Sequence, residues 1–129
     1  MRYPVLIMMT GLLLAESSGV VVVNPNSAKW QVEGGGSESV VLREDAQTGA
    51  LELFARYPAG HVFAPHWHTV NERMVLVEGR MSVNNATLEP GGFAYLPARQ
   101  THAMSCVSTT RCTFYVSWDG HLDFHKADR

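Results

Sequence analysis

Apolar and polar residues alternate in short runs along most of the chain, and glycine, proline or asparagine separates one run from the next. In the clearest run, residues 51–56, every second position is Leu or Ala. A period of two indicates a strand with one buried face. On this basis we expect strands at residues 20–23, 30–33, 39–42, 51–56, 61–68, 73–77, 80–83, 93–96, 101–107 and 113–118.

Turn-forming residues mark the connections between these runs. They fall at residues 24–26, 34–37, 45–49, 58–60, 84–85 and 89–92. No stretch after residue 19 shows a helical apolar period, and evenly spaced short strands are typical of a sandwich or barrel. The length of 129 residues suits one domain, so the expected fold is a single all-β domain.

The first 19 residues have a different pattern. Arg2 precedes an apolar run from Val5 to Ala15, and the small residues Ser17 and Gly19 precede a potential cleavage site after Gly19. This is the pattern of a signal peptide, and the run is shorter than the roughly 20 residues that span a bilayer. We therefore expect a signal peptide at 1–19, the domain at 20–129, and a periplasmic or secreted protein. The alternative is that Val5 to Leu14 forms a buried first element.

The charge distribution narrows the range of partners. The formal net charge is −2, and acidic and basic residues are interspersed. Neither a basic patch nor a charged tail is present, so we expect no nucleic-acid partner and no membrane partner. A small-molecule ligand is the expected partner.

The two cysteines agree with export. Cys106 and Cys112 lie on either side of a polar, turn-like segment. A hairpin centred on Thr109 would set the two sulfurs opposite each other within disulfide reach, with His102 opposite Val116. The alternative is a pair of buried free thiols, as in a cytosolic protein.

Histidines carry the candidate chemistry. Residues two apart on a strand share a face, so His66 and His68 point together and Trp67 points away. Residues 69–71 have the length of a turn, which would let Glu72 begin the next antiparallel strand beside them. His102 follows in a later strand–turn–strand and could arrive from across the barrel. Two imidazoles and a carboxylate form a metal site with open positions, although Glu72 could instead lie at the rim.

These residues resemble the first motif of the cupin superfamily. Its fixed positions are matched by Gly60, His66, His68, Glu72 and Gly79, at the spacing that the family shows. Five fixed positions at fixed spacing make this a specific resemblance.

The second cupin motif is matched in part. Gly91, Pro97 and His102 agree with it, whereas Arg99 stands at the position of its second glycine and Cys106 at that of its asparagine. The motif therefore does not predict the conformation of the loop at Arg99. The resemblance spans roughly residues 51–118.

The resemblance implies a jelly-roll β-barrel that holds one divalent transition metal ion, Fe, Mn, Zn, Ni or Cu, on His66, His68, Glu72 and His102. Metal loading outside the cytoplasm would favour Cu and Zn, whereas open positions suit iron chemistry, so the identity of the metal stays open. The inward-facing residues Met74, Leu76 and Met104 are expected to form the core or the pocket wall. The remaining histidines, His61, His121 and His125, are expected at the surface or rim.

Two functions follow from this site. The first is a metal-dependent oxidoreductase of the dioxygenase type that acts on a small chelating, enolic or phenolic substrate. The second is a non-catalytic module that binds or senses a metal or a small ligand. Exposed sheet edges also predict a homodimer, with Val21, Val23 and Trp30 as candidate contacts.

Overall fold

The computed structural model describes residues 19–127, so all of the expected leader except Gly19 lies outside the described residues. The strands are β1 Gln31–Gly34, β2 Ser37–Glu44, β3 Leu51–Tyr57, β4 Val62–Trp67, β5 Glu72–Glu78, β6 Met81–Val83, β7 Ala86–Leu88, β8 Phe93–Leu96, β9 His102–Cys106, β10 Cys112–Trp118 and β11 His125–Lys126. Within the described range, no helix has the length and apolar character needed to cross a membrane.

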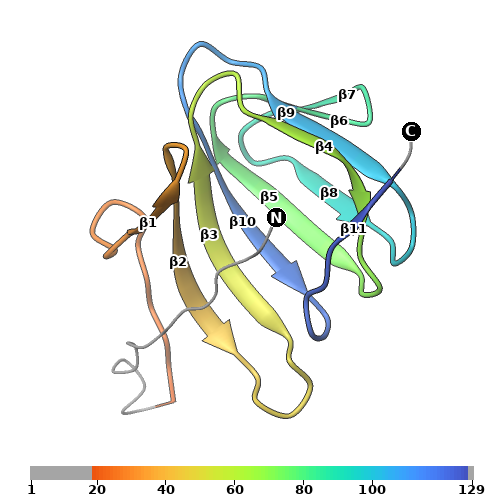
Figure 1. Ribbon diagram of the computed structural model, residues 1–129. Helices are drawn as coiled ribbons and strands as arrows, with labels where there is room; N and C mark the ends of the chain where they lie inside the picture. Colours follow the sequence, from red (N-terminus) through yellow and green to blue (C-terminus); the bar gives the residue numbers. More distant parts are fainter. Residues whose placement is uncertain (1–18, 128–129) are drawn as a thin grey trace.

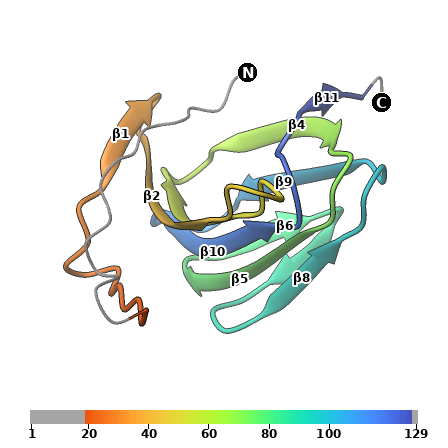
Figure 2. The ribbon, with the colours of Figure 1, turned by 90° about the horizontal axis from the view of Figure 1, so that it is seen from below.

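The strands form two antiparallel sheets that face each other (Figures 1 and 2). Sheet A has six strands in the order β1-β2-β3-β10-β5-β8, and sheet B has five in the order β11-β4-β9-β6-β7. Successive strands repeatedly cross from one sheet to the other, which is the jelly-roll arrangement. The prediction of an all-β jelly roll is confirmed.

Most predicted strands are present, and the differences lie in the shortest pieces. β8 has the predicted bounds, whereas β7 and β11 were not predicted and residues 20–23 form no strand. The β6–β7 hairpin turns at Asn84 and Asn85, whose φ angles of 47° and 71° are positive, as this tight hairpin turn requires. Strands of two or three residues hold too few side chains to show a period.

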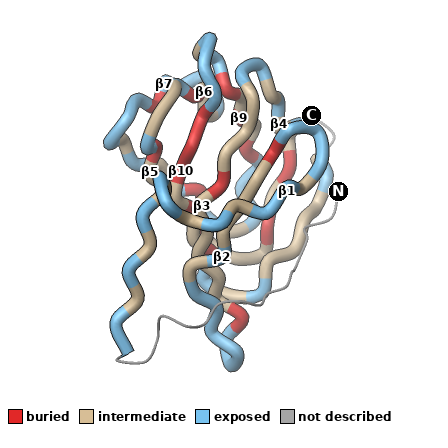
Figure 3. Tube along the Cα trace, turned by 90° about the vertical axis from the view of Figure 1, so that its left-hand side faces the viewer, coloured by how far each residue is buried: buried red, intermediate tan, exposed pale blue. Residues whose placement is uncertain are grey.

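The core lies between the two sheets, where the buried residues of the central strands gather (Figure 3). Alternate side chains of β10 and β5 point inward, and these two strands contribute Phe114, Val116, Met74 and Leu76. Burial of apolar side chains of this size stabilises the fold by about 1.5–3 kcal/mol each. Met74 and Leu76 belong to this core, one of the two places predicted for them, and do not line the cavity of the site.

The predicted hairpin around Thr109 is wrong. β9 pairs with β4 and β6 in sheet B, whereas β10 pairs with β3 and β5 in sheet A. The segment between them crosses from sheet to sheet, because the inward faces of both strands are buried between the two sheets. Cys106 and Cys112 are nevertheless joined by a disulfide, with Cα atoms 5.9 Å apart, so the bond links the two sheets.

Gly79, the last glycine of the first motif, makes room for this crossing. Its φ is 93°, and a Cβ at this position would lie 2.7 Å from Cys112 Sγ and 2.6 Å from the Arg111 carbonyl oxygen. No residue with a side chain fits there without displacing the backbone. The glycine is therefore required by packing beside the disulfide as well as by its positive φ.

The N-terminal residues proposed as dimer contacts are partly engaged within the chain. Val21 and Val23 are half-buried, and Trp30 Nε1 donates a hydrogen bond to the Pro25 carbonyl at 3.0 Å. The Arg56 guanidinium lies 3.9 Å from the centre of the Trp30 ring. The homodimer stays a prediction.

Candidate metal centre

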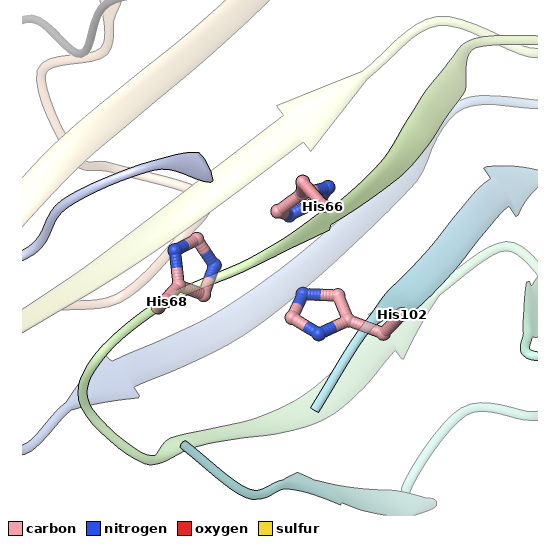
Figure 4. Close-up of side chains that lie close together, drawn as sticks. All are labelled: His66, His68 and His102. Carbon is pink, nitrogen blue, oxygen red and sulfur yellow. The ribbon is translucent and has the colours of Figure 1, made fainter. Parts of the chain in front are cut away.

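Three imidazoles converge at one end of the space between the sheets (Figure 4). His66 lies on β4, His68 follows the end of β4, and His102 begins β9. One ring nitrogen from each lies within 4.8 Å of the others, and all three side chains are buried. Among the described residues, no other histidine joins this group.

Glu72 completes the cluster from the opposite sheet. It begins β5, which belongs to sheet A and does not pair with β4, so the predicted arrangement of Glu72 on a strand beside the two histidines is wrong. His102 is instead the neighbour, because it pairs directly with His66 between β4 and β9. The turn at residues 69–71 crosses between the sheets, which brings the carboxylate to face the imidazoles.

The spacing of the donor atoms fits one metal ion. Glu72 Oε1 lies 3.1 Å from His68 Nε2 and 3.4 Å from His102 Nε2. Adjacent ligand atoms on one ion with bonds of about 2.1 Å lie about 3.0 Å apart in octahedral and about 3.4 Å apart in tetrahedral geometry. Glu72 Oε1 and both ring nitrogens of His102 are buried and make no hydrogen bond to any described residue. Buried polar atoms without partners are what a metal ion would satisfy.

Backbone carbonyls fix the orientation of two of the rings. His66 Nδ1 donates to the Ala64 carbonyl at 2.8 Å, and His68 Nδ1 donates to the Asp123 carbonyl at 2.6 Å. A carbonyl can only accept, so the proton of each neutral ring lies on Nδ1 and the Nε2 lone pair is free to bind a metal.

The electrostatics of the cluster favour positive charge beside the Glu72 carboxylate. Burial lowers the pKa of His66, which favours the neutral, metal-binding ring. Burial would also lower the pKa of His68, but the Glu72 carboxylate and the Asp123 carbonyl outweigh this effect and raise it. Burial would raise the pKa of Glu72, but His102 and His68 lower it well below its usual range. The carboxylate is therefore ionised.

The loop at Arg99 keeps a turn that normally needs glycine. Gln100 N donates to the Pro97 carbonyl at 3.2 Å, and Arg99, the third residue of this turn, has a φ of 68°. A positive φ at the third position is the geometry of a type II turn. Arg99 N also donates to the His68 carbonyl at 2.7 Å, so the turn contacts the backbone of a candidate ligand.

The C-terminal segment closes one side of the site, which the sequence did not predict. β11 pairs with β4 at His66 and Trp67, and the Phe124 ring stacks on the His66 ring at 4.6 Å. The Asp123 carboxylate accepts hydrogen bonds from the backbone N–H of Thr69 at 2.8 Å and from its hydroxyl at 2.7 Å. Nothing in the local pattern of residues 122–127 indicates this role, because it depends on a partner more than 50 positions earlier.

A cavity of about 580 Å³ leads to the cluster. His66, His68 and Glu72 line it, and Met104 is the one residue of the predicted pocket wall that does. Tyr57 also lines it and was not predicted, although it continues the inward-facing alternation of β3. Burial, with the nearby carboxylates of Glu33 and Glu72, raises the pKa of Tyr57 to about 12, so its phenol is a hydrogen-bond donor at neutral pH.

The other histidines have separate surroundings. His61 lines the cavity, and burial lowers its pKa. His125 stacks on the Trp67 ring at 4.0 Å, and His121 is exposed and lies against Gly49.

The sequence matches a known family along most of its length. The model of the ChrR cupin-like domain matches residues 18–122. The DNA damage-repair/toleration protein DRT102 of Arabidopsis thaliana is 33% identical over 95 residues, which are 69% of this chain and 28% of that protein. The chain therefore spans less than a third of the length of this plant relative.

Solved structures share the fold at low sequence identity. An RmlC-like cupin of Ralstonia eutropha has a TM-score of 0.71, with 18% identity and coverage of 87% of this chain and 76% of the other. A protein assigned as an acetylacetone dioxygenase of Methylibium petroleiphilum has a TM-score of 0.70, with 23% identity and coverage of 94% and 88%. In the complex of Rhodobacter sphaeroides SigE with the anti-sigma factor ChrR, the match has a TM-score of 0.65 and 17% identity and covers 74% of this chain and 52% of that one.

Proposed function

Because this chain belongs to the family of ChrR cupin-like domains in the cupin superfamily, we propose that it binds one divalent transition metal ion and uses it in dioxygenase-type oxidation of a small chelating molecule. One observation carries this proposal. Three buried imidazoles and a buried carboxylate meet at the inner end of a cavity, and His66, His68 and Glu72 face into that cavity.

His66, His68, Glu72 and His102 would hold the ion. A metal bound there would supply a Lewis acid with open positions for chelating oxygen atoms and, where it is redox-active, a means of activating dioxygen. The protein's own residues do the rest of the work. The carbonyls of Ala64 and Asp123 hold two rings with Nε2 toward the centre, and the ionised Glu72 offsets the positive charge.

Apolar side chains form the cavity wall beside the histidines. Met104 and Phe124 lie beside the histidines, and neither can transfer a proton. The phenol of Tyr57 can donate a hydrogen bond to a substrate oxygen. This environment suits a substrate that binds as a chelating enolate, because no dedicated acid–base pair is needed.

The second candidate is a non-catalytic module that binds a metal or a small ligand. The likeness to a chain in the SigE–ChrR complex favours it, because that complex contains an anti-sigma factor rather than an enzyme. In that case the same cluster would hold the metal and the cavity would hold a ligand without turnover.

Metal content tests the site shared by both candidates. We expect the double variant His66→Ala, His68→Ala to lose most of its metal when it is analysed by mass spectrometry, whereas His121→Ala, an exposed histidine, should keep the wild-type content. Full metal content in a folded double variant would contradict the site.

Oxygen uptake separates the two candidates. Wild-type protein loaded in turn with Fe, Mn, Ni and Cu should consume dioxygen when acetylacetone or a catechol is added, and the double variant should not. Tight ligand binding without oxygen uptake for every metal would favour the binding module and contradict the oxygenase.

Export is part of the same proposal. The charged start, apolar run and small residues before position 20 support it, and a disulfide between Cys106 and Cys112 is the form expected in an oxidising compartment. Fractionation of cells that express the full chain tests it. Retention of all the protein in the cytoplasm would contradict it.

A further inference from the structure

The cavity has a wall of aromatic rings that the metal cluster does not use. Tyr57, His61 and Phe63 touch one another, with ring centres 4.5 Å apart for Tyr57 and His61 and 4.6 Å apart for each other pair. Phe114 stacks nearly parallel to Tyr57 at 5.9 Å. We call these four residues the aromatic wall; all four line the same cavity as His66, His68 and Glu72.

The wall is built from both sheets. Tyr57 and Phe114 lie on β3 and β10 of sheet A, whereas Phe63 lies on β4 of sheet B. Tyr57 is opposite Cys112, next to the disulfide that joins the sheets. The wall is therefore held at both sides, and its rings are ordered before any ligand arrives, which reduces the entropy lost on binding.

Few charged groups share the cavity with this wall. Apart from Glu72, the charged side chains that line the cavity are Glu33 on β1, Glu38 on β2 and Lys126 on β11. These strands are at or next to the edges of the two sheets, and Glu38 is paired with Arg56. Glu33 is near Tyr57, whose pKa it helps to raise, but most of the other residues that line the cavity are aromatic or apolar, which favours a flat, uncharged group.

We propose that the ligand joins a chelating, two-oxygen head, bound at the metal cluster, to a flat aryl body that packs against Tyr57, Phe63 and Phe114. This rests on the proposed metal-dependent function and narrows its substrate class. The volume of about 580 Å³ exceeds the needs of a small diketone and lies within the roughly 300–1,000 Å³ of drug-sized ligand sites. Tyr57 is the residue that determines this selectivity.

Two probes with the same head and different bodies test the proposal. Acetylacetone and benzoylacetone share a diketone, but benzoylacetone carries a phenyl ring in place of one methyl group. Calorimetric titration of zinc-loaded protein measures both affinities without oxygen chemistry. The affinities of the two diketones for zinc in free solution are measured as well, and they correct for the difference in chelation between the two diketone groups. We expect benzoylacetone to bind about tenfold more tightly after this correction, from the added apolar burial and ring contacts.

Matched variants locate the effect. Tyr57→Leu should bring the corrected ratio close to one and leave the zinc content unchanged. Tyr57→Phe should keep the ratio, since the ring and not the hydroxyl makes the contact. Tyr95→Leu, which removes a tyrosine that is 49% exposed outside the cavity, should keep it as well. If Tyr57→Leu does not fold, Phe63→Leu replaces it with the same expectation.

The outcomes are distinguishable. A corrected ratio near one in zinc-loaded wild-type protein would overturn this inference and leave metal binding intact. Failure of both diketones to bind to the zinc-loaded protein would have the same two consequences. A ratio that survives both leucine variants would overturn the assignment of the wall. Wild-type protein that takes up no zinc or other divalent metal would overturn the proposed function and this inference together.

Discussion

Replacing Arg99 by glycine should stabilise the protein, in contrast to most substitutions. Arg99 has a φ of 68°, a conformation that costs a residue with a Cβ about 1–2 kcal/mol relative to glycine. Glycine also loses more backbone conformational entropy on folding, which offsets roughly 0.5–1 kcal/mol of this gain in stability. The net expectation is a gain of about 0.5–1 kcal/mol in the free energy of unfolding.

Arg99→Ala isolates this backbone effect. It removes the same exposed side chain but keeps the Cβ, so it should leave stability nearly unchanged. Urea unfolding followed by tryptophan fluorescence, with a common slope for the three proteins, gives the two differences from the midpoints. If Arg99→Gly is no more stable than Arg99→Ala, the turn does not hold the left-handed backbone and the reasoning is wrong.

Three further predictions concern the links within and between chains. Reduction of the Cys106–Cys112 disulfide, or its replacement by two alanines, should lower the free energy of unfolding by about 2 kcal/mol, the entropy of closing so short a loop; unchanged urea midpoints with and without reductant would contradict this. The pKa of Asp123 is lowered to about 2, so its stabilising effect is present above pH 4 and fades as the pH falls toward 2. Because this side chain is 37% exposed, Asp123→Asn should cost only about 1 kcal/mol at pH 6 and much less at pH 2, where half of the carboxylate is protonated in the folded protein; an equal loss at both values would exclude the carboxylate as the cause. Light scattering at high concentration should give twice the mass of the chain, and a monomer would contradict the homodimer.

The fold could be predicted because the strands have a short period and clear turns. β8 was found with its own bounds, and the turn at Asn84 and Asn85 was found from its composition. The pairing of the strands could not be predicted in the same way. A short polar segment such as residues 107–111 suits a hairpin as well as a crossing between sheets, and only the packing of both inward faces decides between them.

The members of the candidate site could be named from the spacing, but their arrangement could not. The alternation of His66 and His68 correctly places both side chains in the interior. Glu72 was predicted beside the two histidines and His102 across the barrel, whereas the structure has His102 beside them and Glu72 in the opposite sheet. The length of a turn does not tell whether the chain stays in one sheet. Asp123 and Tyr57 were missed for a related reason, since their contacts with the site depend on tertiary packing.

This arrangement couples the metal site to the packing of the whole barrel. Glu72 belongs to sheet A, whereas His66 and His102 belong to sheet B and His68 directly follows β4 of that sheet. An ion held by all four would therefore link the sheets at one end of β10, where Trp118 pairs with Glu72. The disulfide links them at the other end of β10, at Cys112. The cavity and the aromatic wall lie between these two links, and the width of the cavity depends on the distance between the sheets. A cavity held at both ends keeps its shape when a ligand enters, and a rigid site of this kind discriminates between flat and bulky ligands better than one that can relax.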